Sequence, residues 1–157
     1  MPAFTPWSAE RATEIIASEA GREGALLPIL HALQAAFGYI DRAAEPLIAD
    51  ALNLSRAEVH GVVTFYHDFR SEPAGKHVLR LCRAEACQAA GGDALVDHAE
   101  RRLGTPIGTT TPGGDVTLEA VYCLGLCALG PSAMLDGRVV ARLDAAGLDA
   151  LLDEAGP

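Results

Sequence analysis

The sequence predicts an α+β protein in which an N-terminal module of four helices precedes an α/β unit. Two observations predict this order. Residues 8 to about 69 repeat apolar side chains at spacings of three and four, as helices do, whereas the runs from His77 onward include strand-like stretches. Between these patterns, residues 70–76 are polar and contain both Pro and Gly. We therefore expect a helical domain at residues 1–70 and an α/β domain at residues 71–157.

The first two helices are predicted from their caps and apolar stripes. Ser8 is a suitable N-cap for a helix that ends at Gly21. The second helix ends at Gly38, in a position that favours a left-handed residue. Both helices have an apolar inward face, made of Ala12, Ile15, Ile16 and Ala20 in the first and of Leu26, Leu27, Leu30, Leu33 and Phe37 in the second.

Two further helices complete the predicted module. One begins soon after Asp41 and keeps Pro46 near its first turn, where proline is tolerated. The other opens with Ser55 and Glu58, which have the spacing of a capping box. Their apolar positions are Leu47, Ile48, Ala51 and Leu52 in the third helix and Val59, Val62, Val63 and Tyr66 in the fourth. Four short amphipathic helices with brief connections predict a small helical bundle.

Strand and helix patterns alternate in the second half of the chain. The predicted elements are a strand at 77–82, a helix at 93–103, a loop at 104–115, a strand at 116–122, a hairpin at 133–142 and a helix at 143–154. The hairpin is predicted because Asp136 and Gly137 suit a type I′ turn. Together these elements make an α/β unit of about 80 residues, which is enough for a small domain.

All four cysteines lie in this second half, as two pairs. Cys82 and Cys87 are separated by four residues, and Cys123 and Cys127 by three. Each pair begins where a predicted strand ends, so we expect both pairs at the same edge of a sheet. Four thiolates complete either a structural zinc site or an iron–sulfur cluster. Nearby glycines would let backbone N–H groups approach the sulfur atoms, namely Gly91, Gly92, Gly125 and Gly130.

Two other interpretations of the cysteines are weak, and a third competes with the iron–sulfur cluster. Inert buried cysteines would not be expected to gather at paired spacings, and disulfides need an oxidising compartment. Structural zinc is the serious rival, because zinc-binding pairs separated by three or four residues do occur. The spacing alone therefore leaves zinc and an iron–sulfur cluster both open.

Composition and charge exclude several classes of partner. The formal net charge is −9, from 12 basic and 21 acidic residues, and the chain has no run of Lys or Arg. This argues against a nucleic-acid partner, which normally requires a basic surface. The sequence also has neither a signal-peptide pattern nor the roughly 20 apolar residues of a membrane span. We therefore expect a soluble, cytoplasmic protein without membrane insertion, in which free cysteines serve as ligands.

Basic residues also gather around the first cysteine of this acidic chain. Arg80 and Arg83 bracket Cys82, and Lys76 lies just upstream. They could form a positive patch that guides docking or stabilises a reduced cluster, or they could be the solvated edge of a strand.

The motifs resemble those of a known family. From about residue 10 to residue 143 the chain is similar to the 24-kDa-type subunit of respiratory complex I and its relatives, which are thioredoxin-like [2Fe–2S] proteins. In the helical half the resemblance rests on residues 27–40 and 54–66. In the other half it rests on both cysteine pairs, the loop at 109–115, and Gly130 with Pro131. No ligand position departs from the family pattern.

This resemblance implies a thioredoxin-like [2Fe–2S] ferredoxin domain behind the helical module. It implies one [2Fe–2S] cluster on Cys82, Cys87, Cys123 and Cys127, and docking to a flavoprotein subunit that holds FMN and NAD(H). The chain would be a non-catalytic electron-transfer subunit of an NAD-dependent oxidoreductase, with neither substrate pocket nor catalytic base. The competing class is a structural zinc module, in which four cysteines bind one zinc ion and the domain only joins subunits.

Within the family, the sequence is most similar to the gamma subunit of NAD-dependent molybdenum formate dehydrogenases. The stretches that favour this are residues 83–88 and 66–70. The resemblance then implies a molybdenum and iron–sulfur catalytic subunit beyond the flavoprotein. The complex I subunit and the diaphorase subunit of NAD-reducing hydrogenases are the alternatives.

Overall fold

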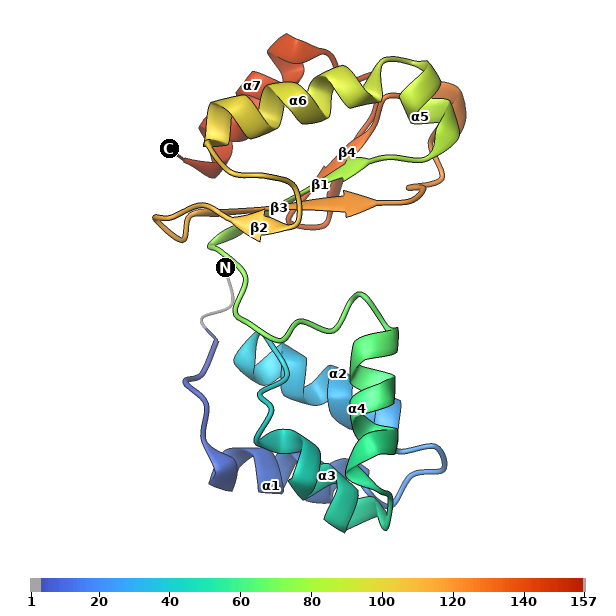
Figure 1. The fold of residues 1–157 in the computed structure, drawn as a ribbon, viewed down its shortest axis with the longest axis vertical. Helices are drawn as coiled ribbons and strands as arrows, with labels where there is room; N and C mark the ends of the chain where they lie inside the picture. Colours follow the sequence, from blue (N-terminus) through green and yellow to red (C-terminus); the bar gives the residue numbers. More distant parts are fainter. Residues whose placement is uncertain (1–3, 157) are drawn as a thin grey trace. The chain divides into compact units, whose positions relative to one another are not determined.

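The computed structural model describes residues 4–156, which divide into two compact units with the boundary between Pro73 and Ala74 (Figure 1). The first unit contains helices and the second a sheet with helices, as the sequence predicts. Within residues 4–156 no helix is both long and apolar enough to cross a bilayer.

The first unit consists of the four predicted helices. They are α1 (Ala9–Glu19), α2 (Leu26–Phe37), α3 (Ala44–Leu52) and α4 (Arg56–Phe65). The predicted caps form: Ser8 Oγ accepts the Arg11 N–H at 3.3 Å, and Gly38 has the left-handed φ of 83°. Ser55 and Glu58 make both hydrogen bonds of the capping box. These local signals determine where three of the helices begin or end.

One apolar core joins these helices. Its fully buried members include Ile29, Leu30, Leu33 and Ile48. The segment before α1 adds to this core, since the Trp7 ring packs against Phe37 with centroids 5.0 Å apart. Phe4 lies against Gly38, and the Thr5 N–H donates to the Ala36 carbonyl at 2.9 Å. The aromatic residues ahead of α1 therefore fold back on the module.

The second unit is a five-stranded mixed sheet in the order β2-β3-β1-β4-β5. The strands are β1 (His77–Cys82), β2 (Thr109–Thr110), β3 (Val116–Val121), β4 (Ala133–Leu135) and β5 (Arg138–Val140). The central pair, β1 and β3, is parallel, and the other neighbours are antiparallel. The turn between β4 and β5 places Asp136 at φ 50° and Gly137 at φ 87°, as the predicted hairpin requires.

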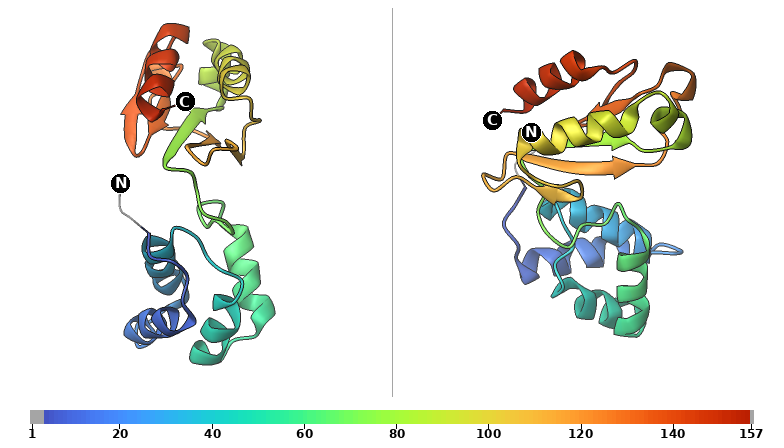
Figure 2. Two further views of the ribbon diagram at one scale, coloured as in Figure 1. Left: turned by 90° about the vertical axis from the view of Figure 1, so that its left-hand side faces the viewer. Right: turned by 45° about the horizontal axis from the view of Figure 1, so that its top comes forward.

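Two long helices cover one face of this sheet. They are α6 (Gly92–Leu103) and α7 (Ala145–Ala155), which lie side by side in both views (Figure 2). Between them and the sheet lies a second apolar core that includes Leu79, Leu118 and Leu148, all fully buried. This core holds β1 and β3 in place, and both cysteine pairs follow from those strands.

Three short elements were not predicted. Helix α5 (Glu85–Ala89) lies between the first two cysteines, a 3₁₀ turn η1 (Cys127–Leu129) begins at the last one, and β2 interrupts the stretch expected to be a loop. Five, three and two residues are too few for a periodic pattern, so only the tertiary structure defines these elements.

Candidate functional site

The two cysteine pairs meet at one edge of the sheet. Cys82 is the last residue of β1 and stands opposite Val121, the last residue of the parallel strand β3. Parallel neighbours end at the same edge, so the loops after them lie together. The Arg83 N–H donates to the Val121 carbonyl at 2.8 Å, and the Cys82 N–H donates to the Ser132 carbonyl at 3.0 Å. The sheet thus brings together the four residues that the sequence predicts as ligands.

The first pair is buried. Cys82 and Cys87 are 4% and 2% exposed, and Cys87 lies in the short helix α5. The Cys87 Sγ lies 3.5 Å from the Ser132 Oγ, and Ser132 is itself buried. The first two sulfur atoms therefore sit among backbone and small side chains, away from water.

The second pair is exposed. The Sγ atoms of Cys123 and Cys127 are 3.6 Å apart, without a disulfide. Cys123 has a φ of 101°, a conformation that is costly for a side chain with a Cβ and that is found at functional sites. The Gly125 N–H donates to the Cys123 Sγ at 3.4 Å, with Gly125 at φ 79°. The loop thus directs a backbone donor at sulfur, as expected.

Electrostatics link the two pairs. Burial raises the pKa of the Cys82 thiol, but hydrogen bonds lower it by more, so the net pKa is below its usual value. The partners in these hydrogen bonds are the backbone of Ala84, the Cys87 thiol, and the backbone of Cys123 and Leu124. The pKa of Cys127 is raised, first by its hydrogen bond with Cys123 and then by the charge of that thiol. Crowded thiolates repel one another, so this arrangement favours a positively charged metal group among them.

Two glycines allow the close packing around Cys87. A Cβ on Gly92 would come within 2.7 Å of the Cys87 carbonyl oxygen, closer than real contacts allow. A Cβ on Gly130 would lie 3.3 Å from the Cys87 Sγ. Two of the four predicted glycines, Gly92 and Gly130, are thus explained, because a side chain at either position would crowd Cys87.

The expected positive patch is largely neutralised. The Lys76 Nζ lies 2.7 Å from Asp115 Oδ1, and the Arg80 Nε lies 2.8 Å from Glu119 Oε2. Strand pairing places Arg80 directly opposite Glu119, which accounts for that ion pair. Arg83 differs, because its Nη2 reaches Asp93 Oδ1 only at 3.4 Å and its Nε is buried without a partner.

The donor set fits a binuclear cluster. A single zinc needs all four sulfur atoms at about 2.3 Å, whereas a [2Fe–2S] cluster takes two cysteines at each of two irons. Two linked thiol pairs agree better with a [2Fe–2S] cluster than with a single zinc ion. The glycines that pack on Cys87 and the buried Arg83 Nε without a hydrogen-bond partner also suit a large anionic group.

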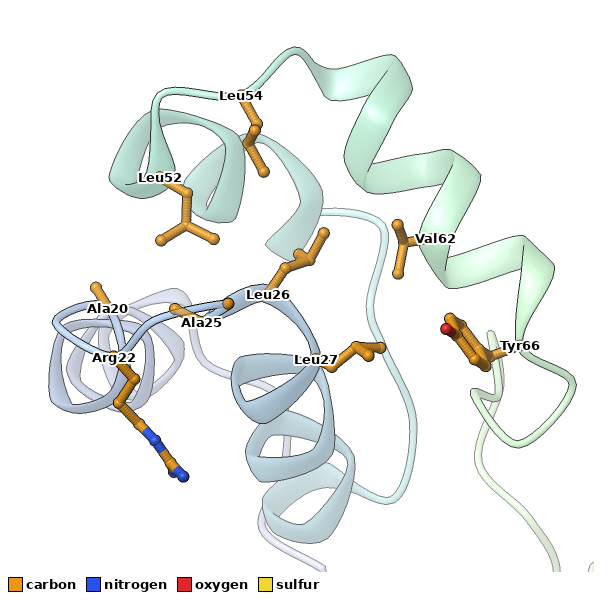
Figure 3. Close-up of a pocket in the computed structure, with 10 residues that line it drawn as sticks. Ala20, Arg22, Ala25, Leu26, Leu27, Leu52, Leu54, Val62 and Tyr66 are labelled. Carbon is orange, nitrogen blue, oxygen red and sulfur yellow. The ribbon is translucent and has the colours of Figure 1, made fainter.

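A pocket of about 390 Å³ in the helical unit offers no comparable chemistry (Figure 3). Its lining is mostly aliphatic, with Leu26, Leu27 and Val62 among the residues shown. Its one cationic residue, Arg22, pairs with Glu19 at 2.6 Å. It contains neither a nucleophile nor an acid–base pair.

Comparison with known proteins identifies the family. The family model described as thioredoxin-like [2Fe–2S] ferredoxin matches residues 12–156. The chain belongs to this family. Its members bind a [2Fe–2S] cluster, and the predicted fold class, four helices followed by a thioredoxin-like [2Fe–2S] domain, is confirmed.

Named relatives of the family are components of NAD(P)-linked complexes. The chain is 38% identical over 132 residues to a subunit of the NADH-quinone oxidoreductase of Rhizobium meliloti, covering 84% of this chain and 79% of the relative. It is 33% identical over 141 residues to the NADP-reducing hydrogenase subunit HndA of Solidesulfovibrio fructosivorans, covering 90% of this chain and 82% of that one. The finer prediction of a formate dehydrogenase gamma subunit gains no support from these two relatives.

A solved structure agrees with the fold. A chain of an NAD⁺-reducing [NiFe]-hydrogenase in the air-oxidized state superposes with a TM-score of 0.70 at 28% identity. The match covers 83% of this chain but only 22% of the hydrogenase chain. The present chain therefore corresponds to one part of that longer polypeptide.

Two residues beside the cysteines were missed as parts of the site. Ser132 contacts Cys87 Sγ although it is 45 positions away in sequence, and it lies in no pattern that spacing could detect. Arg83 is predicted from the sequence only as one member of a surface patch, and neither its buried Nε nor its contact with Asp93 in α6 follows from spacing.

Proposed function

We propose that the chain binds one [2Fe–2S] cluster through Cys82, Cys87, Cys123 and Cys127 and transfers single electrons within an NAD-linked oxidoreductase complex. The observation that carries this proposal is the meeting of two thiol pairs at the end of β1 and β3. Membership of a [2Fe–2S] family supports the choice of metal. The domain boundary near residue 70 is part of the same proposal.

Each pair would hold one iron. The Cys82 and Cys87 thiols interact with each other, and the Cys123 and Cys127 sulfur atoms are neighbours, so pairing within each loop needs the least movement. The backbone N–H of Gly125 and the hydroxyl of Ser132 would then donate to coordinated sulfur. Such donors stabilise negative charge on the ligands and tune a cluster's potential.

The exposed pair provides the route for electrons. Cys123 and Cys127 lie at the surface, and the neighbouring Tyr122 side chain is 74% exposed. The buried pair keeps the other half of the site away from water. When bound, the cluster supplies one-electron chemistry, which complements the two-electron exchange of a flavin with NAD(H). The partner in this proposal is a flavoprotein subunit that holds FMN and NAD(H), and this chain has no catalytic residue of its own.

The relatives favour a complex of the NADH-quinone oxidoreductase or NAD-reducing hydrogenase type. Formate dehydrogenase, with a molybdenum and iron–sulfur catalytic subunit, remains the more specific hypothesis about the complex. It rests on the sequence of residues 66–70 and 83–88. Purification of the complex through a tag on this chain separates these candidates. NAD⁺ reduction by formate supports the formate dehydrogenase, reduction by hydrogen supports the hydrogenase, and quinone reduction by NADH supports the complex I type.

Electron transfer is tested with the chain and its flavoprotein subunit. The chain is reduced with dithionite, freed of excess reductant and mixed anaerobically with the oxidised flavoprotein. We expect the flavin absorbance to bleach as the chain is reoxidised, and we expect weaker bleaching or none with the Cys123→Ser chain. A flavin that stays oxidised beside a reduced chain would contradict the proposal.

A further inference from the structure

Arg83 is fixed between the two cysteine loops. Its N–H donates to the Val121 carbonyl at the end of β3, and its own carbonyl accepts the Gln88 Nε2 at 2.9 Å. It directly follows Cys82 in sequence, and Gln88 directly follows Cys87. Its backbone is therefore held by segments adjacent to three of the four cysteines.

The guanidinium of Arg83 is poorly compensated. Its ion pair with Asp93 is 3.4 Å long, and the Asp93 side chain is 58% exposed to water. Its Nε is the single buried side-chain nitrogen or oxygen without a hydrogen-bond partner within residues 4–156. A buried donor without an acceptor destabilises the fold, and more so when it is charged. Such a cost is offset if negative charge lies nearby.

The position of Asp93 brings this charge close to the buried thiol pair. Asp93 follows Gly92, and a Cβ on Gly92 would lie 2.7 Å from the Cys87 carbonyl and 3.6 Å from the Cys82 carbonyl. The start of α6 thus rests on the backbone of both cysteines. The Arg83 backbone thus follows Cys82 directly, and its guanidinium reaches the residue next to the glycine that packs on both cysteines.

We propose that Arg83 raises the reduction potential of the cluster by holding a permanent positive charge and a buried N–H donor beside Cys82 and Cys87. This inference rests on the proposed function. Reduction adds one electron, supplied by the flavoprotein in the complex or by dithionite in the experiment, and breaks no bond. Arginine keeps its proton at all relevant pH values, so it compensates the added charge without proton uptake. Partial burial strengthens this interaction relative to water.

The test compares three variants of the full chain, each purified without oxygen and titrated with dithionite while the EPR signal is recorded. Arg83→Gln removes the charge and is expected to make one-electron reduction about tenfold less favourable, a fall of about 59 mV. Arg83→Lys keeps the charge and is expected to restore part of that shift.

The matched control is Arg101→Gln, which makes the same change in charge on α6. Arg101 is exposed and lies eight residues after Asp93, about 12 Å along the helix, which exceeds the screening length of about 8 Å at physiological salt. We expect its potential to equal that of the unmodified chain.

Iron and sulfide analysis shows whether each variant still holds an intact cluster, so that a change in reduction potential can be told from loss of the cluster. An Arg83→Gln chain with an intact cluster and the potential of the Arg101→Gln control would overturn the inference. If Arg83→Gln cannot hold the cluster, Asp93→Asn is the deciding variant. It removes the counter-charge of Arg83, so we expect the reduction potential to rise. An unchanged reduction potential would reject the inference. A lack of iron in the unmodified chain would instead reject the proposed function, on which this inference depends.

Discussion

At the residue scale, the cysteines divide into a protected pair and an accessible pair. Cys82 and Cys87 are buried, whereas Cys123 and Cys127 face solvent. Hydrogen bonds within the site lower the pKa of Cys82 despite its burial, while the pKa of Cys127 is raised by Cys123. The accessible pair is therefore the one where a ligand change should be least disruptive to folding.

Replacing Cys123 with Ser tests the ligand role at this pair. We expect the EPR signal of the reduced chain to change or disappear, because a hydroxyl is a poorer ligand for iron than a thiolate. We expect the helical circular dichroism to stay, because Cys123 belongs to neither apolar core. Ala128→Ser is the matched control, since it adds a hydroxyl at an exposed position in η1, five residues after Cys123. An unchanged spectrum for Cys123→Ser would refute the assignment.

Acid stability depends in part on Asp149 in α7. Its carboxylate is hydrogen-bonded to His98 at 2.8 Å and to Arg102 at 3.1 Å, and the bond to His98 is the main cause of its lowered pKa. A lowered carboxylate pKa stabilises the fold above the ordinary value of 3.8 and loses that contribution as the pH falls through the folded value.

We therefore expect Asp149→Asn to reduce the loss of stability between pH 6 and pH 3. The measurement is urea unfolding at both pH values, followed by hydrogen exchange of α7 amides. Asp50→Asn, at an exposed position on α3, is the control and should leave the pH dependence unchanged. An equally steep loss in Asp149→Asn would contradict this account.

At the scale of elements, the start of α6 packs closely on the backbone of Cys87. Gly92→Ala would force a Cβ to 2.7 Å from the Cys87 carbonyl, so α6 or the first cysteine loop must move. We expect a loss of about 1–3 kcal/mol in unfolding free energy for the second unit and an altered EPR spectrum.

Gly61→Ala is the control for this change. Gly61 lies within α4, and a Cβ there would meet no atom within 4 Å. Alanine is the better helix former by about 0.5–1 kcal/mol, so the control should leave stability unchanged or raise it. Equal behaviour of the two variants would show that the contact at Gly92 is unimportant.

The sequence predicted the long elements and missed the short ones for a physical reason. Helices α2 and α6 have 12 residues each, enough for an apolar stripe and a glycine cap to be recognised. Helix α5 has only five residues, and its Cys87 is positioned by Ser132 and Gly130, which are remote in sequence. Elements of that size form because their tertiary neighbours require them.

At the scale of the whole molecule, each unit has its own apolar core. The buried residues of the first core end at Phe69, and those of the second begin at Leu79. All four cysteines belong to the second unit. The four proposed ligands therefore all come from the second unit.

This separation predicts that residues 74–157 fold alone and bind the cluster. We expect the fragment to contain the same iron per chain and to give the same reduced EPR spectrum as the full chain. The fragment with Cys123→Ser serves as the negative control. A folded fragment that binds no iron would show that the helical unit contributes to the site.

The meeting of the four candidate ligands was predictable from the sequence, and so were some of the glycines beside them. The cysteine spacing and the strands before each pair indicated where the four thiols would meet, because parallel strands end at one edge. The surroundings depend on packing between distant segments, as the contacts of Ser132 and Arg83 illustrate. The choice of iron over zinc came from the family resemblance, since spacing left both open.

The central claim is that the four cysteines hold a [2Fe–2S] cluster that carries electrons. The most direct measurement is metal and sulfide analysis of the anaerobically purified chain, with EPR spectra before and after dithionite. We predict two irons and two sulfides per chain and a signal that is present only after reduction. One zinc per chain, with no signal in either state, would contradict the claim and make the cysteines a structural zinc site.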